Sequence, residues 1–116
     1  MNKDILVKIG RDPLAGLTRE EYVDLLKKKL RGRVSEAYIF GSFNTSDFNR
    51  FSDIDLILIC DTRNPFVERG IDFYDIQDLA PATDILVYTP DEFCNIMKEE
   101  PVGFWKSARG SMVRII

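Results

Sequence analysis

The stretch Ile39–Ile59 reads IFGSFNTSDFNRFSDIDLILI and decides the fold. It predicts the end of one strand, a Gly-Ser turn, a polar linker and a buried second strand that opens with Asp53 and Asp55. Residues two apart on a strand share a face, with Cα atoms roughly 6–7 Å apart. Because a bound cation relieves the repulsion between two such carboxylates, the pair predicts an oxygen-ligand site suited to Mg²⁺.

The Gly-Ser turn before this strand is a candidate phosphate site. Gly41 can adopt backbone conformations that other residues resist, and it lets a ligand approach the main chain. If a short helix follows Ser42, its free N–H groups and the Ser hydroxyl would bind phosphate. The alternative is a simple tight turn, but the aspartates downstream favour the phosphate site.

A third carboxylate, Asp84, opens the next expected strand, Ala82–Tyr88. Together with Asp53 and Asp55 it would complete a metal site at one end of the sheet. Two structural alternatives stay open. Asp84 could bond to local backbone groups, as many strand-initiating aspartates do, and the Asp53–Asp55 pair could be neutralised by Arg50 without any metal.

The composition excludes several classes of function. The chain has 116 residues, 45% hydrophobic and 30% charged, as expected for one globular domain spanning 1–116. Sixteen basic and nineteen acidic residues give a net charge of −3, so strong nucleic-acid binding is not expected. The chain contains no histidine, which removes histidine-based nucleophile pairs and general bases. Without a signal peptide or a membrane span, a cytoplasmic location is expected.

Local patterns predict a small mixed α/β sheet packed by helices. Strands are expected near 34–40, 54–60, 84–88 and 112–116, and helices near 18–31, 66–79 and 90–99. Capping boxes at Thr18 and Thr89 mark two helix starts, and Asn64 with Pro65 is expected to start the helix near 66–79. Aromatic residues are assigned to the core, including Phe66, Phe104 and Trp105. Gly110 is expected to break the chain.

The residues Gly41, Ser42, Ser52, Asp53, Asp55 and Asp84, in this order and spacing, resemble the nucleotidyltransferase superfamily of the DNA polymerase β type. The short chain is similar to its minimal nucleotidyltransferases. The resemblance implies that Asp53, Asp55 and Asp84 hold two Mg²⁺ ions and act in catalysis. It also implies that Gly41, Ser42 and Ser52 bind a nucleoside triphosphate.

The resemblance implies that the chain transfers a nucleoside monophosphate, most simply AMP from ATP, to an acceptor hydroxyl. In the minimal family the acceptor is often a tyrosine of a HEPN-domain toxin, which adenylylation silences. An antibiotic-modifying role is disfavoured, because those enzymes usually carry an added domain.

One segment departs from the family pattern. After Gly-Ser and an aromatic residue, minimal nucleotidyltransferases usually continue with Ala, Arg and Gly, whereas this chain has Asn44-Thr45-Ser46. The departure keeps a different class of function open. In that alternative the chain is a catalytically silent, antitoxin-like module that neutralises its partner by contact.

Overall fold

The computed structural model describes residues 12–116, so the expectation for Ile5–Ile9, a short strand or helical turn, lies outside the described residues. One four-stranded sheet organises the fold, in the order β3-β2-β1-β4. Its strands are β1 (Glu36–Phe40), β2 (Ile54–Ile59), β3 (Thr83–Tyr88) and β4 (Val113–Arg114). β1 runs antiparallel to β2 and β4, while β2 and β3 are parallel. The expected small mixed α/β sheet is therefore confirmed.

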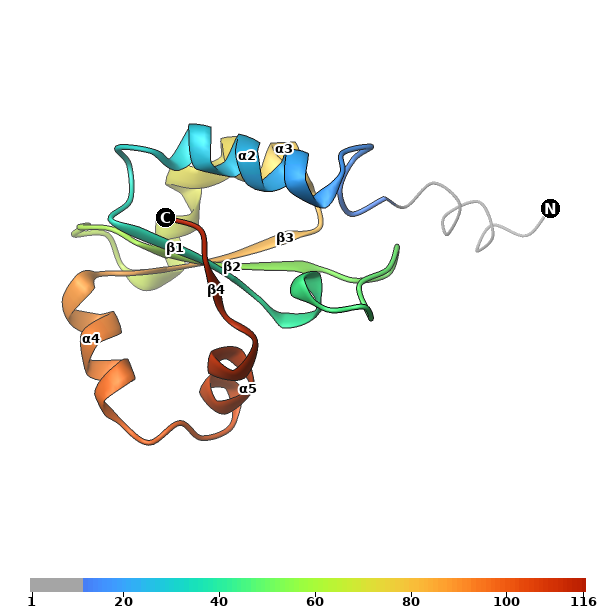
Figure 1. Cartoon of the computed structure of the whole chain (residues 1–116). Helices are drawn as coiled ribbons and strands as arrows, with labels where there is room; N and C mark the ends of the chain where they lie inside the picture. Colours follow the sequence, from blue (N-terminus) through green and yellow to red (C-terminus); the bar gives the residue numbers. More distant parts are fainter. Residues whose placement is uncertain (1–11) are drawn as a thin grey trace.

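Helices cover both faces of the sheet (Figure 1). α2 (Arg19–Leu30) and α3 (Tyr74–Leu79) lie on one face, where Ile54, Leu56 and Leu58 of β2 belong to the larger apolar core. α4 (Pro90–Lys98) and α5 (Phe104–Ser111) lie on the other, where the alternate residues Ile57 and Ile59 join a second core. β2 is thus buried from both sides, as its apolar run predicts.

The two predicted capping boxes are confirmed. The Thr18 hydroxyl accepts from the Glu21 N–H, and the Glu21 carboxylate accepts from the Thr18 N–H. Thr89 and Glu92 make the same reciprocal pair at the start of α4. Each box satisfies two backbone donors that the first helical turn leaves unpaired.

The helix expected near 66–79 is instead two pieces, and its start was wrongly assigned. A 3-10 segment, η2 (Phe66–Phe73), precedes α3, and its N-cap is Pro65, with no side-chain cap from Asn64. Phe66 is not a core residue, because it is 44% exposed. The segment follows the outer edge of β3, so its geometry is set by that strand rather than by helical periodicity.

The C-terminal region also differs from expectation. Gly110 lies inside α5 instead of breaking the chain, and the last strand covers only Val113–Arg114. Phe104 is half exposed and meets the Phe40 ring edge-on at 5.6 Å, whereas Trp105 packs against Tyr88. Helix packing against the sheet outweighs the low helix propensity of one glycine.

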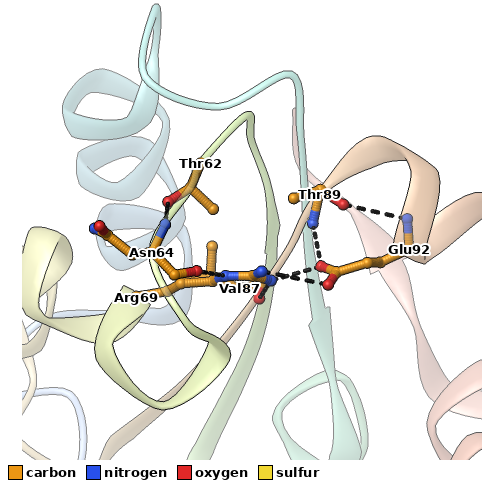
Figure 2. A network of polar contacts seen from close by, with 6 residues as sticks. All are labelled: Thr62, Asn64, Arg69, Val87, Thr89 and Glu92. Carbon is orange, nitrogen blue, oxygen red and sulfur yellow. Dashed lines mark hydrogen bonds and ion pairs between the residues drawn. The ribbon is translucent and has the colours of Figure 1, made fainter.

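An arginine network fixes η2 to the start of α4 (Figure 2). The buried Arg69 guanidinium forms an ion pair with Glu92, and it donates to the carbonyl oxygens of Asn64 and Val87. Glu92 accepts at the same time from the Thr89 N–H. One side chain therefore joins the loop before η2, the strand β3 and the capping box of α4.

Candidate active site

Two of the predicted aspartates are direct neighbours in the sheet. Asp55 is the second residue of β2 and Asp84 the second residue of β3, and the two are register partners in the parallel pairing. Adjacent strands lie about 4.8 Å apart, and register partners project to the same face. Asp55 shares its face with Ile57 and Ile59, so both carboxylates lie on the side covered by α4 and α5.

A cavity of about 350 Å³ opens at these carboxylates. Asp55 and Asp84 line it together with the aromatic rings of Phe40 and Phe104. Burial raises the pKa of the Asp55 carboxyl above its usual value, and the negative charges of Asp84 and then Asp53 raise it further. The three aspartates therefore interact electrostatically, and a cation bound beside them would be favoured.

The Gly-Ser turn lies directly against Asp55. β1 ends at Phe40, which pairs with Asp55, and the 3-10 turn η1 (Gly41–Asn44) follows at once. Gly41 has φ 78°, and a Cβ added there would lie 2.6 Å from Oδ2 of Asp55. Glycine is needed at this position both for the backbone conformation and for the close approach of the carboxylate.

The end of α5 fastens this turn. The Gly41 N–H donates to Oγ of Ser111 at 2.8 Å. The Asn44 side chain donates to the carbonyl oxygens of Ile39 and Ser111, at 3.1 and 3.4 Å. Asn44, which departs from the family pattern, therefore has a structural role in holding the turn between β1 and α5.

The remaining predicted site residues, Ser42, Ser52 and Asp53, lie outside the strands, in the turn η1 and in the loop before β2. Within residues 12–116 the Ser42 hydroxyl has no hydrogen-bond partner, so it is available to a ligand. Asp53 is exposed and directly precedes β2. The Ser52 hydroxyl accepts from the Asn49 N–H in the loop before β2, so it has a local structural partner.

The donor chemistry fits Mg²⁺ carried by a nucleotide. The part of the chain from residue 12 onward contains no group of three acidic, Cys or His side chains already gathered around one point. Mg²⁺, however, is commonly held by one or two carboxylates, with phosphate oxygens and water completing its coordination. Asp55 and Asp84 supply such a pair, and Asp53 adds charge nearby.

Sequence reasoning missed Ser111 and the position of Phe104. Ser111 lies far from Gly41 in sequence, so no local pattern reveals the contact. The local signal that could have predicted α5 is the helical spacing of its apolar residues Phe104, Trp105 and Ala108.

A four-stranded mixed sheet with paired carboxylates beside a Gly-Ser turn defines this protein as a nucleotidyltransferase-type α/β protein. The family model described as "Polymerase beta, Nucleotidyltransferase" matches residues 20–103, well over half of the chain. The chain therefore belongs to the polymerase β-type nucleotidyltransferase family, and the resemblance seen in its sequence is confirmed.

Two further proteins are similar to this chain. The chain is 38% identical over 48 residues to a protein of Methanocaldococcus jannaschii that is named for an inferred protein adenylyltransferase activity. That match spans 41% of this chain and 48% of the relative. A crystal structure of an inferred nucleotidyltransferase from Sulfolobus solfataricus aligns with TM-score 0.48 and 21% identity, over 75% of this chain and 84% of that one.

The helices within residues 12–116 are all too short or too polar to span a lipid bilayer.

Proposed function

We propose that the chain transfers a nucleoside monophosphate, AMP from ATP, to an acceptor hydroxyl in an Mg²⁺-dependent reaction. The observation that supports this most is the register pairing of Asp55 with Asp84 directly beside Gly41. Family membership supports the reaction class, and the name of the M. jannaschii relative supports adenylyl transfer to a protein.

The reaction is an in-line displacement at the α-phosphorus of the nucleotide. The acceptor oxygen forms a bond to this phosphorus, the bond to the bridging oxygen of the β-phosphate breaks, and pyrophosphate leaves with the electron pair. The acceptor proton passes to solvent. Bound Mg²⁺ would neutralise charge on the entering and leaving oxygens.

The chain's own residues have distinct parts in this scheme. Asp53 and Asp55 would hold the ions on the triphosphate, and Asp84, the register partner of Asp55, would help hold the ion nearest the acceptor hydroxyl and favour deprotonation of that hydroxyl. Gly41 and the Ser42 hydroxyl would orient the terminal phosphates. Such catalysis depends mainly on positioning and charge neutralisation, so the lack of histidine is no obstacle.

A tyrosine of a HEPN-domain protein is the proposed acceptor, which would give the chain an antitoxin role. The test is incubation with ATP labelled at the α-phosphate, Mg²⁺ and a HEPN-domain protein encoded beside this chain. Label should transfer to the acceptor, and Asp53→Asn, Asp55→Asn and Asp84→Asn should each reduce the rate by on the order of 100-fold or more. Unlabelled acceptor, or transfer that survives these substitutions, would refute the proposal.

A second candidate function is a catalytically silent module that neutralises its partner by contact. It is favoured by the turn itself, because the Gly41 N–H is already bonded to Ser111 and Asn44 occupies the altered position. In that case toxin neutralisation would persist in Asp53→Asn without any label transfer.

A further inference from the structure

A second cavity, of about 300 Å³, lies along the edge strand β3 and is lined in part by Asp84. Thr83, Asp84 and Ile85 of β3 form one wall, and η2 and α3 form the other through Val67, Gly70, Ile71, Tyr74 and Gln77. We call this cavity the edge groove. Asp84 and its neighbour Ile85 line both the edge groove and the cavity at Asp55.

The edge groove exposes backbone groups suited to an extended chain. β3 is an edge strand, and Ala82 O and Tyr88 O point to β2, where they accept from backbone N–H groups. By strand alternation, the N–H and C=O groups of odd-numbered residues then point outward. Gln77 already bonds to Thr83 O, and Arg69 bonds to Val87 O.

Ile85 lies between these two occupied positions. Across residues 12–116, its outward N–H and C=O have no hydrogen-bond partner outside the sheet ladder. A free donor and acceptor on a sheet edge pair readily with an added extended segment. Because Ile85 follows Asp84 directly, such a segment would pass next to the candidate catalytic carboxylate.

The walls of the groove are apolar and its surroundings are acidic. Val67, Ile71 and Tyr74 are 87%, 56% and 60% exposed, an unusual exposure for three neighbouring apolar side chains. Residues 66–86 carry five acidic residues, Glu68, Asp72, Asp75, Asp78 and Asp84. Asp75 is paired with Arg33, so the other four acids make these surroundings negative. The one basic residue of that segment, Arg69, is already paired with Glu92.

We infer that the edge groove binds the acceptor as an extended, basic polypeptide segment, which carries its hydroxyl side chain to Asp84. The inference rests on the proposed function and assigns its acceptor to a binding surface. Backbone pairing at Ile85 sets the register, contacts with Val67 and Ile71 add apolar burial, and the acidic surroundings select Lys and Arg.

The experiment selects peptides from a short synthetic library with a fixed central tyrosine, using immobilised protein with Mg²⁺ and a nonhydrolysable ATP analogue. The expected result is enrichment of Lys and Arg around the tyrosine. Val67→Lys should weaken binding of an enriched peptide on the order of tenfold, because it adds positive charge and removes an apolar contact. Val102→Lys is the matched control, since Val102 is 76% exposed and lies outside the groove.

Peptide binding should also protect the Ile85 amide from hydrogen exchange. The inference is overturned if no basic peptide is selected, if Val67→Lys and Val102→Lys bind alike, or if Ile85 is unprotected. Thermal stabilisation by ATP with Mg²⁺ reports separately on the proposed function. Loss of peptide binding with nucleotide stabilisation intact refutes the groove alone, while missing nucleotide stabilisation refutes the proposed function.

Discussion

Gly41 and Asp55 are in contact across the end of the sheet, and only a glycine allows this approach. A Cβ on Gly41 would lie 2.6 Å from Oδ2 of Asp55, and Gly41 has φ 78°. The position of Gly41, the first residue of the proposed phosphate-binding turn, therefore depends on Asp55, a proposed metal ligand. Substitution of either residue should therefore affect both the proposed phosphate binding and the proposed metal binding.

Gly41→Ala should displace the Asp55 carboxylate and strain the turn. We expect a loss of stability of about 1–2 kcal/mol from the positive φ alone, together with loss of stabilisation by ATP and Mg²⁺. Urea unfolding and thermal shift with the nucleotide measure the two effects. Gly110→Ala is the control, because Gly110 is helical and a Cβ added there would meet no atom within 4 Å. This substitution should leave stability unchanged or increase it. Wild-type nucleotide binding in Gly41→Ala would contradict the contact.

Asp55→Asn should stabilise the protein in the absence of metal while abolishing transfer. Burial, Asp84 and Asp53 raise the folded-state pKa of Asp55, so ionised Asp55 opposes folding. The protonated carboxyl is the form that the folded state favours. The stability that it contributes is complete below the unfolded pKa and is lost as pH rises through the folded pKa. Removing the charge should raise Tm at pH 7 by a few degrees at most, because solvent reaches the partly buried carboxyl and screens the repulsion.

The Tm difference between Asp55→Asn and wild type should shrink as pH falls through the raised folded pKa of Asp55, and it should be gone below the usual aspartate pKa. Mg²⁺ with ATP should stabilise wild type but not the variant. Asp61→Asn, at the other end of β2, is the control and should change neither Tm nor its response to Mg²⁺. A lower Tm for metal-free Asp55→Asn at pH 7 would mean that the carboxylates do not repel one another.

Ser111→Ala should loosen the Gly-Ser turn. It removes the acceptor of the Gly41 N–H and so leaves a partly buried donor unpaired. A loss of about 1–3 kcal/mol is expected in urea unfolding, with weaker nucleotide stabilisation. Ser107→Ala on the same helix is the control, because Ser107 is exposed and its hydroxyl has no partner within residues 12–116. Equal stability of the two variants would show that α5 does not hold the turn.

Glu92→Gln should reduce stability at neutral pH and flatten its dependence on acid. The hydrogen bond from Arg69, with that from Thr89, lowers the Glu92 pKa from 4.5 to about 2. The stabilisation is present above pH 4.5 and is lost as pH falls towards 2. Because the Glu92 side chain is 43% exposed, we expect only about 1 kcal/mol.

Glutamine keeps the capping box, so this variant isolates the ion pair. Urea unfolding between pH 2 and 7 measures the effect, and Glu100→Gln, an exposed neighbour beyond α4, is the control. If the free energy of unfolding of Glu92→Gln falls with decreasing pH as it does in wild type, the ion pair is not the cause of that acid dependence.

The sequence could predict the elements whose signals are local. The capping boxes at Thr18 and Thr89 fixed two helix starts, and the apolar run Leu56–Ile59 fixed a strand buried on both faces. The η2 segment could not be predicted in this way, because it is held by Arg69 contacts to β3 and α4. Only Phe73 at its end reaches the core, whereas Val67 and Ile71 lie exposed along the groove.

The sequence by itself determined the family, through the order and spacing of Gly41, Ser42, Asp53 and Asp55. Such spacing is set along a single turn and strand, where backbone geometry alone fixes which side chains are near one another. Only the tertiary structure decided that Asp84 stands beside Asp55, that Ser111 holds the turn and that a groove runs past Asp84. Those relationships depend on strand order and register, which are set by packing between residues far apart in the chain.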